Sequence, residues 1–366
     1  MRHSLTIIVS LIVLAAITLS ACGEKKPSPA EQTQAALADT ISQWHSDFAA
    51  STSALTAAAD QFCSSPNANR WLALQQRWKE AMLDWQAVGI INFGPVLDGN
   101  QAWKIQFWPD KHNLVAKKIR AILAEDTSID VARIEKASVV IQGLSGLEYL
   151  LFDPSVQPID YEREPRRCDL LKAVAGHTMG VARQIDSHWH ATTGDYFTLF
   201  AHPAADNPAY KDFNAALTAV IDAILADIEN VRWKKLAGPA GMETQGDKTL
   251  FKPRPYLAEA WRSQSSLALA KANIDAVDQL LTALRPYLDS HPNGAPLGQS
   301  IHSHIKTIQQ QLDSIDISLI QAITHPPDQD KLAKIDKQLA DLLAQLKRPL
   351  PTALGITLGF NANDGD

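Results

Sequence analysis

The chain has 366 residues and a formal net charge of −6, and hydrophobic residues make up 46% of it. That hydrophobic share is enough for packed cores and too high for a disordered chain. The acidic balance argues against a nucleic-acid partner, which would need a basic face. Because the length exceeds the usual size of a single core, two domains are expected.

The first 21 residues are typical of a targeting signal. Arg2 and His3 precede an apolar run from Leu5 to Ala21, and small residues stand just before Cys22. A charged start, a short apolar centre and small residues before a cut are typical of a secretory signal, and the run is short for a membrane span. The cysteine resembles that of a bacterial lipobox, which implies cleavage before Cys22 and lipidation of its thiol. The alternatives are an ordinary signal peptide or an N-terminal anchor helix.

The residues after the cut indicate where the body of the protein would lie. Gly23 stands where an aspartate would resemble an inner-membrane retention signal, so we expect a lipid anchor in the outer membrane and a periplasmic body. One acyl chain such as palmitate gives only marginal membrane binding, whereas the three of a typical bacterial lipoprotein suffice. Residues 22–30 contain two prolines, two lysines and no apolar pattern, which predicts a polar tether.

Two cysteines remain if Cys22 carries lipid, and they are Cys63 and Cys168. An oxidising periplasm favours a disulfide between such an even pair. This disulfide would tie two helices of the first domain together. Two buried free thiols are the alternative.

Hydrophobic residues recur at alternating steps of three and four over most of the body, which predicts amphipathic helices. Such stripes lie within residues 71–88, 217–231, 267–288, 301–319 and 332–346. No stretch shows sustained alternation, so few or no strands are expected. We therefore predict an all-α protein of two antiparallel helical bundles, over residues 31–204 and 205–366, with the boundary in the connection at 201–208.

Proline and glycine mark the connections between the predicted helices. Trp108, Pro109 and Asp110 suggest a helix start, with proline at the first helical position and an acid in the first turn. Residues 238–255 contain three glycines and are expected to form a long loop.

Several short, ordered motifs carry a resemblance to a known family. They are residues 142–152, 107–110 and 259–263, with the terminal residues 358–361 and 364–366. Together they resemble the imelysin-like family, in its subgroup of periplasmic lipoproteins. That family carries a glycine, a histidine two residues on and a glutamate three beyond it, and these positions hold Gly143, Ser145 and Glu148 here. The resemblance implies a duplicated four-helix-bundle architecture and either a metal or peptidase site or a role tied to iron uptake.

Ser145 and Glu148 are three positions apart, so a helix would place them on one face. A histidine and a glutamate so placed can share a metal ion, but serine lacks the ring nitrogen that suits zinc and most transition metals. Both residues can still bind a ligand through hydrogen bonds, and Glu148 remains as a candidate metal ligand. The alternative is that Glu148 is a buried acid satisfied by an arginine or a helix end.

No catalytic residue is assigned. A serine nucleophile needs Gly-x-Ser-x-Gly between a strand and a helix. Ser145 fails this requirement, because position 147 is Leu147 and no strand is expected before it.

Glu259, Arg262 and Ser266 fall at steps of three and four, which predicts one shared helix face. An arginine fork can clamp a carboxylate or an anionic ligand, so Arg262 and Ser266 are candidate ligand-binding residues. Arg262 has two other interpretations: a local pair with Glu259, or a pair with Glu148 across the two bundles. The pair with Glu148 would make a polar pocket at the domain interface, a usual place for ligand sites.

Asp110 and Trp108 complete the candidate ligand-binding set. Asp110 is also explained as an acid that favours a helix N-terminus. Trp108 is also explained as a packing residue rather than a ring that stacks on a ligand. The deciding question is whether Glu148, Arg262 and Asp110 converge in space.

Three functions follow from these patterns. The first is a non-catalytic ligand-binding or accessory lipoprotein linked to iron uptake, whose ligand is iron, an iron chelate or an envelope protein of that uptake. The second is a metallopeptidase, which the insulin-cleaving membrane protease of the family implies, although the motif histidine is replaced by Ser145. The third is a structural envelope lipoprotein. We expect the first, and the only candidate cofactor is iron or another divalent metal.

Overall fold

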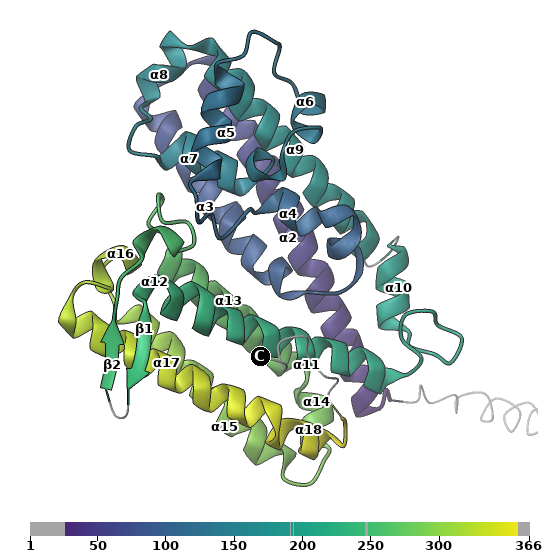
Figure 1. Cartoon of the computed structure of the whole chain (residues 1–366). Helices are drawn as coiled ribbons and strands as arrows, with labels where there is room; N and C mark the ends of the chain where they lie inside the picture. The colour runs from purple at the N-terminus through teal and green to yellow at the C-terminus, as the bar shows by residue number, and fades with distance from the viewer. Residues whose placement is uncertain (1–25, 191, 193, 246–247, 358–366) are drawn as a thin grey trace, which may run out of the picture.

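The computed structural model describes residues 26–190, 192, 194–245 and 248–357. The predicted signal peptide, residues 22–25 of the predicted tether with Cys22, and the family motifs at 358–366 lie outside the described residues, so cleavage and lipidation stay predictions. Within the described ranges the chain folds into two sets of antiparallel helices that pack against each other (Figure 1). This arrangement confirms the predicted all-α fold class. Across the same ranges, no helix combines the length and the apolar character needed to cross a membrane.

The first set of helices occupies most of the upper half of Figure 1. It consists of α2 (Pro29–Ser64), α3 (Ala68–Ile90), η1 (Gly94–Asn100), α4 (Gln101–Ile105), α5 (Leu114–Leu123), α6 (Val131–Glu135), η2 (Val139–Ile141), α7 (Leu144–Phe152), α8 (Pro158–Arg163), α9 (Pro165–Trp189) and α10 (Asp195–Ala201). The long helices α2, α3 and α9 form its frame, and the short helix α7 packs against α3 and α9.

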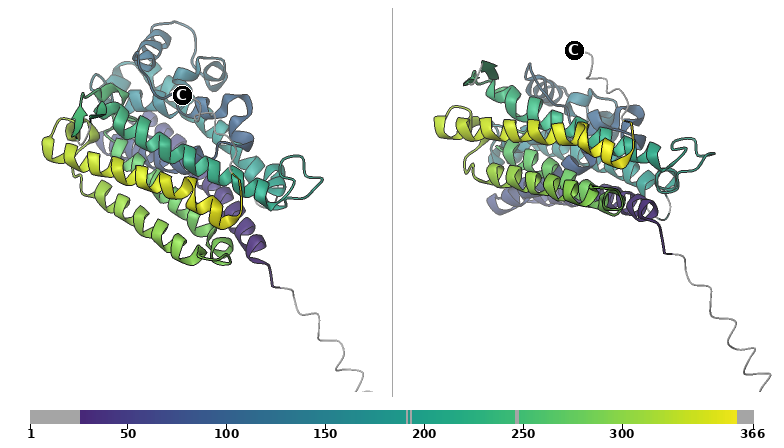
Figure 2. Two further views of the ribbon diagram at one scale, coloured as in Figure 1. Left: turned by 60° about the horizontal axis from the view of Figure 1, so that its bottom comes forward. Right: turned by 90° about the horizontal axis from the view of Figure 1, so that it is seen from below.

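The second set forms the lower half of Figure 1, and Figure 2 shows its green and yellow helices running side by side. It consists of α11 (Phe213–Glu229), the π-helix η3 (Asn230–Ala237), α12 (Gly238–Ala240), β1 (Met242–Gln245), β2 (Lys248–Phe251), η4 (Pro255–Leu257), α13 (Ser266–Ala283), α14 (Arg285–Asp289), α15 (Gly294–Asp313), α16 (Leu319–Ala322), α17 (Pro326–Lys347) and α18 (Pro349–Leu354). Helix α13 also contacts α2 and α3, so the two sets share an interface. The chain passes from one set to the other between α10 and α11; whether each set is an independent domain stays a prediction.

Local sequence explains where the first helices begin and which face they bury. Helix α2 begins with a capping box, in which Ser28 and Glu31 exchange hydrogen bonds with each other's backbone N–H groups. Asn67 caps α3 by accepting the N–H of Arg70 at 3.0 Å. The predicted tryptophan stripe of α3 is buried at Trp71, Trp78 and Trp85. Each of these features depends on residues within one or two helical turns.

A disulfide joins Cys63, near the end of α2, to Cys168 in α9, with the two Cα atoms 5.5 Å apart. This confirms the predicted pairing. The cysteines are 105 residues apart in sequence, so the bond closes a long loop in the first set. Closing a loop of this length restricts the unfolded chain strongly.

The expectation that a helix begins at Pro109 is wrong. Helix α5 begins at Leu114. Asp110 lies before the helix, and its two carboxylate oxygens accept the N–H groups of Leu114 at 2.7 Å and Val115 at 3.0 Å. The side chain therefore satisfies backbone donors that the first turn of α5 leaves without partners.

The expectation of a long loop at residues 238–255 is also wrong in part. The chain continues as a helix through η3 and α12, and then β1 pairs antiparallel with β2, with Met242 opposite Phe251. Gly241 makes the change of direction, with φ +58 and a position where a Cβ would lie 1.9 Å from the carbonyl oxygen of Lys252. Only glycine tolerates both the left-handed backbone and this close approach.

Candidate functional site

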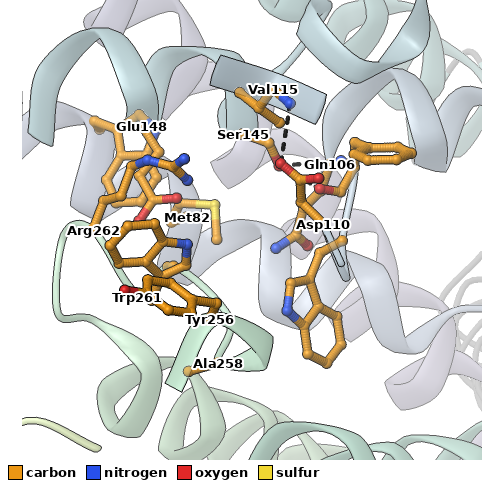
Figure 3. Close-up of a pocket in the computed structure, with 14 residues that line it drawn as sticks. Met82, Gln106, Asp110, Val115, Ser145, Glu148, Tyr256, Ala258, Trp261 and Arg262 are labelled. Carbon is orange, nitrogen blue, oxygen red and sulfur yellow. Dashed lines mark hydrogen bonds between the residues drawn. The ribbon is translucent and has the colours of Figure 1, made fainter. Parts of the chain in front are cut away.

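A pocket lies at the interface of the two sets of helices (Figure 3). Its cavity volume is about 20 Å³, which is room for little more than a water-sized group behind an open mouth. Five of the six predicted ligand-binding residues line it, namely Trp108, Asp110, Ser145, Glu148 and Arg262. Figure 3 shows Glu148, Arg262, Trp261 and Tyr256 on one side, facing Ser145, Asp110 and Gln106 on the other. Glu148, Arg262 and Asp110 therefore converge on one pocket, which answers the question left by the sequence.

Gly143 explains how α7 reaches this position. It immediately precedes α7, and a Cβ on it would lie 2.1 Å from the carbonyl oxygen of Ile105. The start of α7 therefore contacts the backbone at the end of α4 so closely that only glycine fits. This contact brings the side chains of α7 against residues 106–110.

Ser145 uses its hydroxyl to hold that segment. Its Oγ accepts the N–H of Phe107 at 3.1 Å and donates to the carbonyl oxygen of Phe107 at 3.0 Å. A hydroxyl can donate one hydrogen bond, and the hydroxyl of Ser145 donates it to a backbone carbonyl. Ser145 thus positions one wall of the pocket.

Glu148 connects the two sets of helices. Its side chain is buried, and Oε1 accepts the backbone N–H of Ser263 at 2.9 Å. Burial raises the pKa of the Glu148 carboxyl, while the Ser263 N–H and the charge of Arg262 partly oppose the rise. Glu148 therefore keeps its proton to a higher pH than an exposed glutamate would.

Arg262 pairs with neither of the two acids proposed from sequence. Its Nε donates to Asp153 Oδ2 at 2.8 Å, and its Nη2 donates to Asn113 Oδ1 at 2.7 Å. The guanidinium also lies over the Trp261 ring, 4.3 Å from the centroid. Burial acts to raise the pKa of Asp153, but hydrogen bonds from Ser155 and Arg262 bring that pKa below its ordinary value. Asp153 was missed because nothing in its local sequence links it to a residue 109 positions away.

The predicted helix face of Glu259, Arg262 and Ser266 does not form. Residues 258–265 are not helical, and α13 begins at Ser266. Ala260 has φ +48 and Gln264 has φ +57. Both angles lie in the left-handed region, which breaks a right-handed helix and is unfavourable for residues other than glycine.

The same loop, residues 258–265, places the side chain of Glu259 in a second group of buried residues. Glu259 Oε2 lies 2.8 Å from Lys235 Nζ, and both side chains are almost fully buried. Lys235 also donates to Asn273 Oδ1 at 2.7 Å, and Asn273 Nδ2 donates to Asp227 Oδ1 at 3.0 Å. We call Asp227, Lys235, Glu259 and Asn273 the Lys235 cluster. Burial raises the pKa of Asp227 to about 7, opposed by the charge of Lys235 and reinforced by that of Glu259.

Ser266 belongs to this cluster rather than to the pocket. Its hydroxyl donates to the backbone carbonyl of Glu259, and it does not line the pocket. Gln106 connects the two regions, since its Nε2 donates to Glu259 Oε1 at 2.7 Å and its Oε1 accepts the indole N–H of Trp85 at 2.7 Å. Asp227 left a signal in the sequence: it is an acid inside the apolar stripe of residues 217–231, where burial of an acid requires partners.

Trp108 and Asp110 have clear local roles. The indole N–H of Trp108 donates to the carbonyl oxygen of Leu257 at 3.1 Å, which links the two sets of helices. Asp110 caps α5, in agreement with its interpretation as an acid at a helix N-terminus. Both side chains still border the pocket, so these local roles do not remove them from the site.

The residues around Glu148 do not fit a resident transition-metal ion. Over the ranges that the structure describes, no three or more His, Cys, Asp or Glu side chains are placed to hold a metal. The pocket lining holds two carboxylates and no imidazole or thiolate, whereas zinc and most transition-metal sites use nitrogen or sulfur ligands. The arrangement is suited instead to binding a molecule through hydrogen bonds and aromatic contacts.

Comparison with known proteins places these features in context. A family model described as imelysin matches residues 41–346. Iron-regulated protein A of Synechococcus elongatus is 22% identical over 339 residues, which cover 90% of this chain and 86% of that protein. The crystal structure of an imelysin-like protein from Psychrobacter arcticum has a TM-score of 0.73 at 18% identity, over 90% of this chain and 98% of that one. A protein described as an iron-regulated protein A precursor, from Parabacteroides distasonis, has a TM-score of 0.66 at 15% identity, over 88% and 95% of the two chains. At these identities the structures show a shared fold.

Proposed function

Since the chain belongs to the imelysin family, we propose that it is a non-catalytic lipoprotein that binds an iron-bearing ligand between its two sets of helices. In this proposal the ligand binds over the mouth of the pocket beside Glu148 and Arg262, because the pocket itself has room for little more than a water-sized group. The anchor is lipid on Cys22 in the outer membrane, with the body in the periplasm and a role linked to iron uptake.

One observation carries the non-catalytic part of the proposal. The two polar side chains of the family motif are engaged in holding the backbone, Ser145 with Phe107 and Glu148 with Ser263. Ser145 donates its one proton to a carbonyl and has no ring nitrogen, and Glu148, which keeps lone pairs beyond the one N–H it accepts, has no imidazole or thiolate beside it in the pocket lining. Here the motif joins the pocket walls, and the pocket recognises a ligand through its aromatic rings and remaining polar groups.

The link to iron rests on the printed names of two relatives, both described as iron-regulated protein A. The pocket chemistry favours iron held within a small molecule over bare iron, because the lining does not supply a complete set of metal ligands. The ligand would enter with its iron already coordinated.

The proposed anchor is supported by the sequence before the described body: a charged start, an apolar run and small residues ahead of Cys22. Metabolic labelling with palmitate tests it directly. We expect labelled chain in the outer-membrane fraction and no label in a Cys22→Ser variant. Label that persists in the variant would contradict the proposal.

The binding proposal is tested on the full chain, purified in detergent. The chain is incubated with ferric citrate, with an uncharged ferric trihydroxamate complex or with a charged ferric tris-catecholate complex. After gel filtration, bound iron is measured by mass spectrometry. We expect one of these probes to remain bound and a Tyr256→Ala variant to lose it. Tyr256 lines the pocket with 67% of its surface exposed, so its truncation should leave the fold intact.

Leu72→Ala provides the control, since Leu72 is 63% exposed on α3 and does not line the pocket. Cleavage of a peptide such as the insulin B chain is assayed in parallel. Stoichiometric zinc together with chelator-sensitive cleavage would overturn the proposal in favour of a metallopeptidase. Failure of every iron probe would also overturn it, in favour of a structural envelope lipoprotein.

A further inference from the structure

A second hollow opens beside the pocket and shares Trp108 with it. Its volume is about 570 Å³. Three tryptophans and three basic residues dominate its lining: Trp103, Trp108, Trp233, Lys111, Lys234 and Arg254. We call this hollow the tryptophan groove. Its residues come from both sets of helices, since α4 and the 106–113 segment face η3 and the segment before η4.

The groove exposes two large aromatic rings. Trp103 is 48% exposed and Trp233 is 53% exposed. Large exposed aromatic surface is unusual on a folded protein unless it binds something. Rings of this kind stack on flat groups and on cations, and they lose little conformational freedom in doing so.

Contacts behind the rings hold them in place. The guanidinium of Arg232 lies 3.9 Å from the centroid of the Trp233 ring. Arg232 is itself held by two hydrogen bonds to the Asp336 carboxylate, at 2.8 and 3.1 Å. Trp108 is held by its bond to the Leu257 carbonyl. Preorganised rings reduce the entropy lost on binding, so this surface is prepared for a ligand.

The charge of the groove is positive, in a chain with a net charge of −6. Lys111, Lys234 and Arg254 are exposed, and their side chains form no ion pair or hydrogen bond with the described residues. None of the described residues that line the groove is acidic. The local field therefore favours a ligand with several negative charges.

The π-helix η3 explains why one segment serves both regions. Within it, Trp233 and Lys234 are exposed toward the groove, whereas Lys235 is buried in the Lys235 cluster. π-helical turns are rare and occur mainly at functional sites. The π-helical turn therefore connects two exposed residues of the groove directly to Lys235, a buried cation in the interior.

We propose that the tryptophan groove binds the ferric complex of three catecholate groups. This inference rests on the proposed function, and it adds the chemical class of the ligand and a second binding surface. Three doubly deprotonated catechols around one ferric ion carry three net negative charges, which the three free cations complement. The flat catechol rings stack on the exposed indoles. Because Trp108 lines both hollows, a molecule bound in the groove reaches the mouth of the pocket.

Isothermal titration of the full chain in detergent tests this assignment. The probe is the ferric complex of a synthetic hexadentate tris-catecholate ligand, with its gallium counterpart as a redox-inert duplicate. We expect both to bind, and we expect the double variant Lys234→Glu and Arg254→Glu to bind at least tenfold more weakly. The matched control is Lys117→Glu with Lys118→Glu on α5, which changes the net charge equally at exposed lysines outside the groove and should leave affinity unchanged. Trp233→Ala should also weaken binding at least tenfold.

The outcomes separate this inference from the proposed function. Binding of the tris-catecholate complex that is unaffected in both groove variants but lost in Tyr256→Ala would overturn the groove and leave the proposed function standing. Preference for the uncharged trihydroxamate complex, or for an oligomer of uronate sugars, would overturn the ligand class. If no ferric probe binds at all, both proposals fail together.

Discussion

Glu148 and Asp227 are both buried carboxyl groups, yet they differ in what surrounds them. Glu148 borders a pocket and accepts a backbone N–H from the opposite set of helices. Asp227 lies in the sealed Lys235 cluster, where Oδ1 accepts from Asn273 and Oδ2 has no hydrogen-bond partner among the described residues. Burial raises the pKa of both carboxyls. One buried carboxyl is thus held by a backbone N–H from across the interface, whereas the other lies among buried charges that shift its pKa in opposite directions.

The cations of the two regions, Arg262 and Lys235, also differ in how they contact their partners. The guanidinium of Arg262 donates one hydrogen bond to Asp153 and another to Asn113, and it lies over the Trp261 ring. These directional contacts fix the position of the guanidinium. Lys235 is a compact charge that serves Glu259 and Asn273 at once. Arginine suits directional recognition at a pocket wall, whereas lysine suits a crowded buried cluster. Four experiments test this contrast.

Removing the buried cation should cost the most. Lys235→Met leaves Glu259 and Asp227 buried without a positive partner, so we expect the free energy of unfolding to fall by about 3–5 kcal/mol. Denaturant titration followed by circular dichroism measures it. The control is the neighbouring exposed residue in Lys234→Met, whose effect should stay within about 0.5 kcal/mol. Equally small losses in the two variants would show that the cluster does not depend on Lys235.

The disulfide lies in the first set of helices, which supplies Glu148 to the pocket. The Lys235 cluster contains no disulfide. Helix α7 packs against α9, which Cys168 ties to α2. Replacing both Cys63 and Cys168 with alanine should lower the free energy of unfolding by about 2–4 kcal/mol, because the unfolded chain regains the freedom of a long loop. A reductant should have a similar effect on the wild type and none on the variant. If reductant leaves the free energy of unfolding of the wild type unchanged, this prediction is wrong.

The two carboxyls should also respond to pH. The pKa of Asp227 is about 7 in the folded protein against an ordinary 3.8, so the folded chain holds a proton that the unfolded chain has released. The stability from this proton is fully present below about pH 4 and is lost as the pH rises through about 7. Between pH 5 and pH 8, the free energy of unfolding of the wild type should therefore fall by on the order of 2 kcal/mol more than that of Asp227→Asn.

Glu148→Gln serves as the comparison for that measurement. The Glu148 pKa is also raised, so its contribution has the same sign and is likewise lost as the pH rises. We expect a smaller change, because Glu148 has a backbone donor and a nearby arginine. A difference between Asp227→Asn and the wild type that does not vary with pH would contradict the assignment of the raised pKa.

The smallest effect tests the fork of Arg262. Arg262→Lys keeps the charge but replaces the planar fork, whose Nε and Nη2 reach Asp153 and Asn113 in fixed directions, with a single ammonium, so we expect a loss of about 1–2 kcal/mol of unfolding free energy. The pKa of Asp153 should rise toward its ordinary value, which nuclear magnetic resonance titration of the carboxyl would detect. Arg232→Lys is the matched control, since its fork holds Asp336 at a less buried place. Equal losses in the two variants would remove the distinction between the pocket wall and an ordinary ion pair.

Several features of the site were predictable from motifs alone. The sequence motifs indicate Glu148, Arg262, Asp110 and Trp108 as site residues, and these four residues line one pocket. Their partners were not predictable. The Arg262 side chain was expected near Glu148 or Glu259, whereas it bonds to Asp153 and Asn113. The left-handed residues Ala260 and Gln264 decide this outcome, because they end the helical path that would have aligned Glu259 with Arg262.

The sequence by itself determined the helices, their buried faces and the class of fold. Those features repeat every turn and depend on neighbours within a few residues, as the stripe of Trp71, Trp78 and Trp85 illustrates. The disulfide was predictable for a different reason, since the predicted export to an oxidising compartment favours pairing of the two cysteines that remain. Only the tertiary structure decided which charges are sealed together and which border a pocket. Lys235 and Glu259 are neither adjacent in sequence nor on one helix, and they meet because the loop of residues 258–265 brings Glu259 to η3, where each buried charge gains a partner of opposite sign.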